Sequence, residues 1–165
     1  MLDPSKTSLA MDKTDIKILE LIQKDARISI VDLADKVNLT PTPCARRVQN
    51  LEKAGYITDY VGLLDQRKVG LSVNAFIELR LVREQEDEIR DFESKIVDYP
   101  EIMECYALSG GHDYLLRVVA PDLESYHLFL REKLLSIRAV DTVQTSFALD
   151  KVVYRTSLPL DHLKS

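Results

Sequence analysis

The chain has 165 residues, of which 45% are hydrophobic and 30% are charged, a balance typical of folded globular proteins rather than disordered ones. No apolar stretch approaches the ~20 residues that a membrane span requires, so we expect a cytoplasmic protein that makes no membrane contact. The only two cysteines, Cys44 and Cys105, lie far apart in the sequence, which excludes a disulfide framework and a clustered zinc site.

The net charge of −5 is distributed unevenly along the chain. Residues 1–64 carry nine basic and nine acidic side chains, so the excess of acid falls entirely on residues 65–165. An acidic total does not exclude nucleic-acid binding, because phosphate contacts depend on the local charge of the docking surface.

Two helices are predicted at the start of the chain. Between residues 12 and 23, apolar side chains recur at helical spacing, which predicts an amphipathic helix packed against others. Ser29 then stands three residues before Asp32, the signature of a capped helix start, and predicts a short second helix.

A third helix is predicted after a tight break at Asn38 and Leu39. We expect Thr40 to cap this helix, with Pro41 at its first position, where a missing N–H costs nothing. Gly55 is expected to end it. Two helices separated by three or four residues and preceded by a supporting helix form the helix-turn-helix pattern, which is found in DNA-binding proteins.

The second half of the chain predicts an α+β domain. A β-prone stretch over residues 56–64 and a polar hinge at 65–70 lead into the order β-α-β-β-α-β. The expected strands cover residues 73–81, 102–109, 114–119 and 140–149, and the expected helices cover about 89–97 and 123–134. Because strand–helix–strand crossovers are right-handed, this order gives a four-stranded antiparallel sheet with both helices on one face.

The other face of this sheet would expose apolar side chains. Phe76, Tyr106 and Phe147 are expected to lie on it. A sheet with one open face commonly buries that face against a second copy of the chain, so we expect a homodimer.

The third helix has one apolar face and one polar face. Cys44, Val48 and Leu51 fall within a narrow arc and are expected to face the core. The opposite arc holds Thr42, Arg46, Gln49, Asn50 and Lys53, with Arg47 on its flank. Arg bonds guanine and Asn or Gln bonds adenine, but a solvated face that binds nothing has the same composition. The capped three-helix context favours DNA.

Several segments of the chain closely resemble the Lrp/AsnC family of feast/famine regulators. The resemblance covers about residues 12–155 and is strongest to the part of the family near the leucine-responsive branch. Its segments are DKTDIKIL at 12–19, QKDARIS at 23–29, TPTPCARRV at 40–48, LEKAGYI at 51–57, ECY at 104–106, SGGHDYLLR at 109–117 and SFAL at 146–149. TPTPC followed some 65 residues later by the SGGHDYLL loop is far more specific than either motif alone.

The resemblance implies a sequence-specific transcriptional regulator of amino-acid metabolism genes. It implies a winged-helix-like DNA-binding domain at 1–55, a β linker at 56–70 that pairs between protomers, and a ferredoxin-like ligand-binding and oligomerisation domain at 71–155. A tail at 156–165 follows. Homodimers are expected to assemble into octamers that bind an amino acid between dimers. The expected contacts to double-stranded DNA come from Thr40, Thr42, Pro43, Arg46, Arg47, Gln49, Asn50 and Lys53.

The loop around Gly110 and Gly111 is the candidate effector site. Paired glycines permit positive φ and close approach of a ligand, backbone N–H groups suit a carboxylate, and Asp113 suits an α-ammonium group. An ordinary hairpin turn has the same residues, and only the resemblance favours a ligand site. His112 could tune specificity or add pH sensitivity, although a solvated loop histidine is the simpler interpretation.

The effector set implied by the resemblance combines this loop with part of the last strand. It consists of Leu108, Ser109, Gly110, Gly111, His112, Asp113, Tyr114, Thr145, Ser146 and Phe147. An apolar amino acid is expected, with leucine or methionine as first candidates, and no other cofactor or metal is expected.

Two alternatives remain at this stage. An enzyme is disfavoured because no nucleophile has a base at motif spacing, and Glu104 beside Cys105 would raise rather than lower the pKa of that thiol. A metabolite-binding module that regulates a partner protein, with an idle helix-turn-helix, would use the same two halves.

Overall fold

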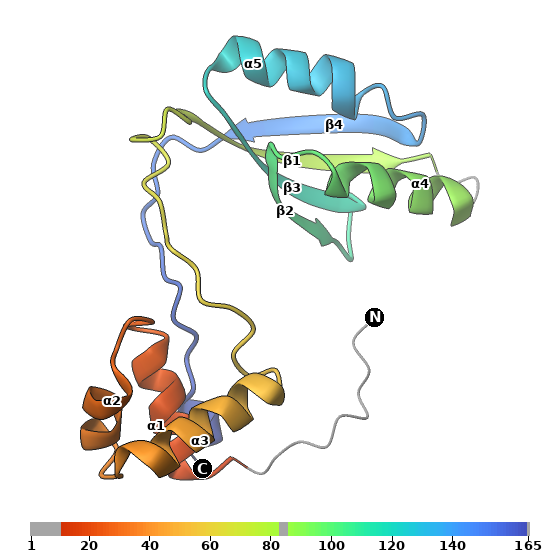
Figure 1. Ribbon diagram of the computed structural model, residues 1–165. Helices are drawn as coiled ribbons and strands as arrows, with labels where there is room; N and C mark the ends of the chain where they lie inside the picture. The colour runs from red at the N-terminus through yellow and green to blue at the C-terminus, as the bar shows by residue number, and fades with distance from the viewer. Residues whose placement is uncertain (1–10, 83–85, 165) are drawn as a thin grey trace. The chain divides into compact units, whose positions relative to one another are not determined.

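The computed structural model describes residues 11–82 and 86–164 and divides them into two compact units. One unit comprises residues up to Leu63 together with the returning segment from Val153 onward, and the other comprises Leu64–Val152. Figure 1 shows the helices of the first unit and the sheet of the second. Residues 1–10 of the expected N-terminal domain and Ser165 of the expected tail lie outside the described residues.

The first unit contains the helices α1 (Lys13–Ile22), α2 (Ile30–Lys36) and α3 (Pro41–Lys53). Asp12 caps α1 in a reciprocal capping box with Asp15, which the sequence analysis did not identify. Ser29 caps α2 as predicted, because its side chain accepts from the backbone N–H of Asp32.

The boundaries of α3 follow from local backbone geometry. Asn38 has a φ of 55°, which turns the chain sharply between α2 and α3. Gly55 has a φ of 78°, the left-handed conformation expected just beyond a helix end. Thr40 is the N-cap residue and Pro41 the first helical residue, as predicted, although the Thr40 side chain makes no capping hydrogen bond within the described residues.

A small apolar core holds the three helices together. Ile18, Leu33, Ala34 and Cys44 are almost completely buried, and Val48 and Leu51 pack beside them. Cys44 therefore behaves as a small apolar core residue, as predicted.

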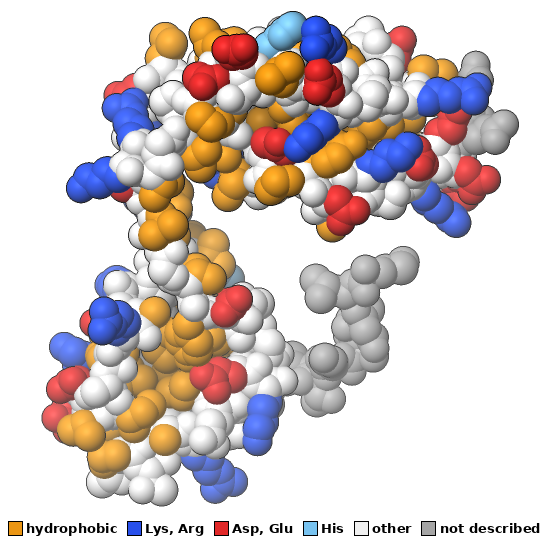
Figure 2. Space-filling view, turned by 45° about the horizontal axis from the view of Figure 1, so that its top comes forward, with side chains coloured by type: hydrophobic (Ala, Val, Ile, Leu, Met, Phe, Trp, Pro, Cys, Tyr) orange, Lys and Arg blue, Asp and Glu red, His pale blue; other side chains and the backbone are white. Residues whose placement is uncertain are grey.

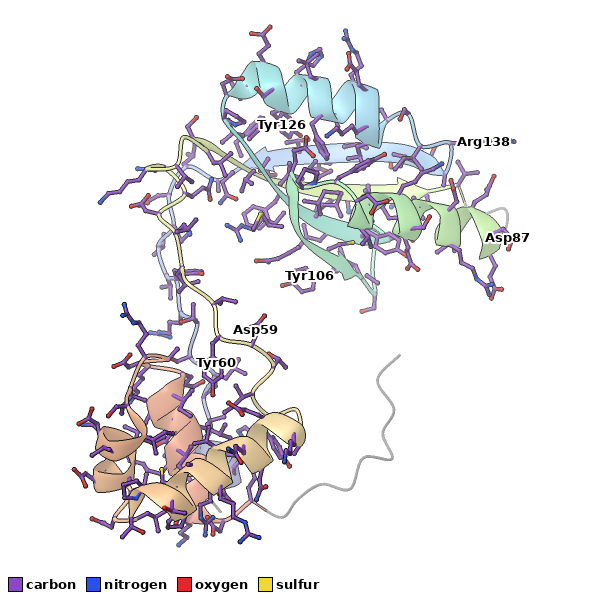
Figure 3. All side chains as sticks on the ribbon, viewed as in Figure 1. Asp59, Tyr60, Asp87, Tyr106, Tyr126 and Arg138 are labelled. Atoms are coloured by element: carbon purple, nitrogen blue, oxygen red, sulfur yellow. The ribbon has the colours of Figure 1, made fainter. Side chains whose placement is uncertain are left out.

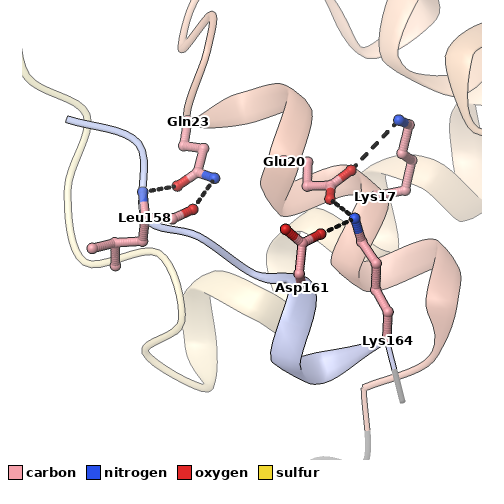
Figure 4. Close-up of polar contacts among 6 residues, drawn as sticks. All are labelled: Lys17, Glu20, Gln23, Leu158, Asp161 and Lys164. Atoms are coloured by element: carbon pink, nitrogen blue, oxygen red, sulfur yellow. Dashed lines mark hydrogen bonds and ion pairs between the residues drawn. The ribbon is translucent and has the colours of Figure 1, made fainter. Parts of the chain in front are cut away.

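The C-terminal segment returns to this helical unit. Gln23 at the end of α1 forms two hydrogen bonds of 2.9 Å with the backbone of Leu158, one in each direction. Lys164, after the short 3₁₀ helix η2 (Asp161–Leu163), lies 2.5 Å from a carboxylate oxygen of Glu20 (Figure 4). Residues 153–164 are thus part of the helical unit and not a free tail.

The second unit has the predicted order of elements. In the described part of the chain, four strands form one antiparallel sheet in the order β2-β3-β1-β4. These are β1 (Val73–Leu81), β2 (Ile102–Ala107), β3 (Tyr114–Ala120) and β4 (Val140–Phe147), alternating with α4 (Glu86–Val97) and α5 (Leu123–Leu128). The chain continues from α5 into a π-helical stretch, η1 (Phe129–Leu134).

The helices α4 and α5 form one layer that covers a single face of the sheet. Alternate side chains of β1, from Ala75 to Leu81, are buried together with Phe92 of α4 and Tyr126 of α5. This alternation places Phe76 and the other even-numbered residues of β1 on the opposite, open face. The α+β class and the helix-turn-helix domain predicted from the sequence are confirmed.

The open face is more polar than the sequence suggested. Arg117 of β3 donates to Glu104 of β2 at 2.9 Å and to Asn74 of β1 at 3.2 Å, and the Tyr106 hydroxyl donates to the same Glu104 at 3.1 Å. Figure 3 shows Tyr106 pointing away from the layer of helices, whereas Tyr126 lies between α5 and the sheet. Figure 2, in which the top of Figure 1 comes forward, presents the side of this unit that carries α5 rather than the open face; there too, charged side chains of both signs lie among hydrophobic ones.

Phe147 does not lie on the open face, so that expectation was wrong. It pairs with Ala75, whose side chain is buried under the helices, and its ring lies 5.1 Å from the ring of Tyr126. The strand alternation shows which residues share a face, whereas only the register of β4 on β1 decides which face that is.

Residues 56–64, which were expected to form a β linker, are all among the described residues and form no strand within one chain. Several of their side chains are exposed, including Val61 and Leu63. A strand at this position requires a partner strand that a single chain does not supply.

Candidate nucleic-acid interface and effector loop

The outward face of α3 carries a continuous polar surface. The helix buries Cys44, Val48 and Leu51, so the opposite side of α3 is turned outward. The exposed residues of this outward surface are Thr40, Thr42, Pro43, Arg46, Gln49, Asn50 and Lys53. Seven of the eight residues expected to contact DNA thus lie on one exposed surface.

Arg47 is the exception among these eight residues. Its Nη1 lies 2.8 Å from a carboxylate oxygen of Asp12 and 2.7 Å from one of Asp15. The guanidinium is directed toward the start of α1 and is only partly exposed. The hydrogen bonds that Arg47 donates to Asp15 and then to Asp12 raise the pKa of Arg47, so both carboxylates stabilise its charge.

Glu52, the acidic residue of α3, is also engaged within the unit. It accepts a 2.8 Å hydrogen bond from the Tyr60 hydroxyl. Burial, followed by this contact with Glu52, raises the pKa of Tyr60 to about 12. Arg46 and Lys53, by contrast, have no side-chain hydrogen bond or ion pair to any described residue, so the outward surface of α3 is locally positive.

A shallow hollow of about 290 Å³ adjoins this surface. Pro43, Arg46 and Asn50 of the outward surface line it together with residues of α1 and the segment after α3. Because α3 protrudes beside this hollow, the guanidinium of Arg46 and the amide of Asn50 are accessible to a large ligand.

The loop between β2 and β3 is fastened to β1 by backbone and side-chain hydrogen bonds. The N–H of Leu108 donates to the carbonyl of Asp113 at 2.8 Å, and the N–H of Asp113 donates to the carbonyl of Leu79 at 2.9 Å. The Asp113 carboxylate accepts from the N–H of Leu81 at 2.9 Å. Asp113 therefore supports the edge of the sheet, in addition to any role toward a ligand.

The glycines of this loop do not use the conformational freedom expected of them. Among the described glycines, positive φ occurs at Gly55 and Gly70, not at Gly110 or Gly111. A Cβ on Gly111 would lie 3.7 Å from the Arg80 guanidinium, an ordinary contact, and one on Gly110 would meet open space. Neither glycine therefore uses the positive φ that a glycine permits, and Arg80 Nε holds the loop by donating to the carbonyl of Gly111.

Beside the loop lies a polar hollow of about 420 Å³. It is lined by Arg80, Leu81, Gly110, Gly111, Asp113 and Asp141. Arg80 and Asp141 present opposite charges there, a combination that suits both poles of a zwitterion. Neither residue was predicted from the sequence, because both are adjacent to the loop only through the pairing of β1 with β3 and β4.

The other predicted effector residues are divided between the two faces of the sheet. The Nδ1 of His112 lies 3.6 Å from Glu78. Tyr114 is buried toward the helices, where its hydroxyl donates to Glu93 at 2.7 Å and burial raises its pKa.

The predicted residues of the last strand lie away from the loop within one chain, because β1 separates β4 from β3. Thr145 shares a 2.6 Å hydrogen bond with the Tyr126 hydroxyl, Phe147 contacts the same ring, and Ser146 pairs with Phe76.

The described residues contain neither a cluster of metal ligands nor a membrane-spanning helix. Among residues 11–82 and 86–164, no three His, Cys, Asp or Glu side chains are grouped so that they could hold a metal ion. No helix in this part of the chain is both long and apolar enough to span a bilayer.

Both halves of the chain match known protein families. Residues 11–58 match the family described as winged helix-turn-helix DNA-binding, and residues 74–158 match the Lrp/AsnC ligand binding domain. A Bkd operon transcriptional regulator of Pseudomonas aeruginosa is 39% identical over 150 residues, which cover 91% of this chain and 98% of that protein. A leucine-responsive regulatory protein of Klebsiella pneumoniae is 39% identical over 142 residues, 86% of this chain and 87% of that protein.

Solved structures resemble this chain along nearly its whole length. A transcriptional regulator of Neisseria meningitidis in complex with L-Met has a TM-score of 0.90 and 40% identity, covering 93% of this chain and 99% of that one. An AsnC family transcriptional regulator of Agrobacterium tumefaciens has a TM-score of 0.87 and 39% identity, covering 92% of this chain and 99% of that one.

Proposed function

Because this chain belongs to the Lrp/AsnC family of DNA-binding transcriptional regulators, we propose that it reads DNA with the outward surface of α3 and responds to an apolar amino acid. The observation that carries the first half of the proposal is the exposed surface with Arg46, Gln49 and Asn50 at its centre. These side chains have the geometry to pair with base edges in the major groove, while Thr40, Thr42 and Lys53 suit phosphates.

Substitution of Arg46 tests the DNA half of the proposal. Arg46→Ala should weaken binding to a duplex selected from a random pool by the wild-type protein, by about 1–3 kcal/mol if Arg46 reads a base. Lys36→Ala at the end of α2 serves as the control that removes one positive charge from the same unit outside the proposed surface. Equal affinity of the wild type and Arg46→Ala, with both folded, would contradict the assignment of α3.

We infer that the effector binds at the polar hollow beside the 108–113 loop. Its opposite charges at Arg80 and Asp141 suit the carboxylate and ammonium groups of a free amino acid, and the similar regulator from Neisseria meningitidis was solved with L-Met. Leucine and methionine are the first candidates because leucine-responsive regulators are among the relatives. The hollow has few apolar walls, so an apolar side chain needs further surface from a second copy of the chain.

A thermal-shift screen against the twenty amino acids tests this effector site. A ligand at a hundredfold its dissociation constant should stabilise the protein by about 2.7 kcal/mol. Asp141→Asn is the informative variant, since it removes one charge of the hollow, and the Asp141 side chain makes no hydrogen bond to another described residue that the substitution would break. Asp113→Ala would be ambiguous, because it also leaves the N–H of Leu81 without its acceptor. The absence of any stabilising amino acid would contradict the proposal.

The assembly proposed is a homodimer through the open face of the sheet, with dimers associating further toward an octamer. An effector between dimers would shift the arrangement of several α3 helices on spaced half-sites, provided that it binds two assemblies with different affinity. We assign the protein no catalytic activity, because the relatives are transcriptional regulators. Action on chromosomal DNA implies a cytoplasmic protein.

A further inference from the structure

Arg47 joins the start of α1 to the middle of α3. Asp12 is the N-cap of α1, and its carboxylate accepts from the backbone N–H groups of Thr14 and Asp15 at 2.8 and 2.9 Å. The carboxylate of Asp15 reaches back to the N–H of Asp12 at 3.2 Å. One nitrogen of the Arg47 guanidinium contacts both carboxylates, so the cap of α1 and the body of α3 share one polar cluster.

The cluster is partly removed from solvent, which strengthens its charge-assisted hydrogen bonds. The side chain of Asp15 is 14% exposed and that of Arg47 is 33% exposed. The pKa of Asp12 is lowered, first by the N–H of Asp15 and also by Arg47, so this carboxylate is charged at neutral pH. Charge-assisted hydrogen bonds with this degree of burial hold a side chain in one orientation more firmly than exposed surface pairs do.

The net charge of the cluster is unfavourable for direct contact with DNA. Two carboxylates on one guanidinium leave a net charge of about −1 next to a helix that is proposed to approach phosphates. These charges therefore favour a structural purpose for Arg47, although its neighbour Arg46 is fully directed outward.

We propose that Arg47 is a positioning residue for DNA recognition, which orients α3 on α1 through Asp12 and Asp15 and does not itself contact DNA. The proposal rests on the proposed role of α3 in reading DNA. Fixing the rotation of α3 about its axis decides where Arg46 and Asn50 point, so loss of the cluster disturbs recognition without removing a DNA contact.

The experiment uses the DNA duplex that the wild-type protein selects from a random pool. It measures the affinity of Arg47→Ala, Arg47→Lys and Asp15→Asn for this duplex, and how that affinity depends on salt concentration. Each variant should bind about tenfold more weakly, and the double variant Arg47→Ala with Asp15→Asn should be little worse than either single one, because both remove the same interaction. The slope of log affinity against log salt should stay that of the wild type.

A direct phosphate contact predicts different results in two respects. Arg47→Ala would then reduce the salt slope by about one, and Asp15→Asn would bind as tightly as the wild type or more tightly, because it removes a repulsive charge. Either result would overturn the positioning role. Asp35→Asn on α2 is the matched control for loss of one acidic charge, since Asp35 is exposed and has no side-chain partner among the described residues.

Folding and the proposed function are separated by two further variants. Asp12→Asn keeps a good N-cap residue while weakening the Arg47 contact, so it tests the cluster even if Arg47→Ala fails to fold. It should show a smaller loss of affinity with the wild-type salt slope, and unchanged affinity would count against the proposal. If Arg46→Ala and the cluster variants all leave the DNA affinity unchanged, α3 is not the helix that reads DNA. If Arg46→Ala lowers the affinity but the cluster variants leave it unchanged, only the positioning role of Arg47 is wrong.

Discussion

Adjacent residues of this chain have opposite surroundings because helices and strands turn neighbouring side chains to different sides. Arg46 is exposed while Arg47 is held by two carboxylates. Cys105 and Glu104 show the same effect on β2, where Glu104 contacts Arg117 on the open face. The pKa of Cys105 is raised as expected from the sequence, but the cause is first desolvation of the thiol by its surroundings, although the residue keeps an exposed surface, and then the charge of Glu93, not that of Glu104.

Cys105 should react slowly with thiol reagents at neutral pH. Its pKa is raised to about 11, so the reactive thiolate is a minor species at pH 7 and its fraction rises about tenfold for each pH unit up to 10. Labelling with a maleimide or disulfide reagent between pH 7 and 10 measures this dependence. The variant Cys105→Ser identifies any contribution of the buried Cys44, and a rate that levels off near pH 8.5 would contradict the raised pKa.

The C-terminal segment is the element whose role the sequence least revealed. Residues 156–165 were expected to be a C-terminal tail. In the structure, residues 153–164 belong to the helical unit and contact α1 and its end at Glu20 and Gln23. Gln23 supplies both a donor and an acceptor to the backbone of one residue, Leu158, as a paired strand would. The helical unit is therefore completed by residues that lie more than 130 positions away in the sequence.

Gln23→Ala should loosen the C-terminal segment from the helical unit. It removes two hydrogen bonds to the Leu158 backbone, each contributing about 0.5–1.5 kcal/mol, so the unfolding midpoint of this unit should fall. Carboxypeptidase digestion, followed by mass spectrometry, should then remove residues past 158 faster than in the wild type. Lys24→Ala is the neighbouring control, and equal digestion of both variants would show that Gln23 does not hold the segment.

At the scale of the whole molecule, each unit has its own core, so the two can be studied separately. The sheet unit contains every element of the predicted α+β domain between residues 64 and 152. The helical unit is discontinuous in sequence because it needs residues 153–164. A fragment that ends at residue 63 therefore lacks part of its own packing.

A fragment of residues 65–152 should fold, remain oligomeric and lose DNA binding. Sedimentation measures its mass, and the substitution Phe76→Asp, at the centre of the open face between β3 and β4, should convert it to monomers. Charge buried against a second sheet would be costly, which is the reason for the expected dissociation. Val97→Asp, an exposed site on α4, is the control. A monomeric wild-type fragment would disprove assembly through this face.

Much of the fold and part of the candidate site were determined by the sequence itself. The order of elements, the α3 face with Cys44 inward and Arg46 outward, the Ser29 cap and the Gly55 helix end all depend on residues within one or two turns of one another. Such local patterns are readable because the period of a helix or strand and the geometry of a cap are properties of a short segment. Family resemblance added the general function, which local patterns do not contain.

The tertiary structure alone decided the contacts between segments that are distant in sequence. It turned Arg47 toward Asp12 and Asp15 and placed Phe147 on the face of the sheet that the helices cover. It also brought Arg80 and Asp141 beside the glycine loop and joined Leu158 to Gln23 by hydrogen bonds. Periodicity gives the relative orientation of side chains within one element, but strand register and helix packing give their absolute orientation. These depend on the simultaneous packing of all elements, which a single segment of sequence does not encode.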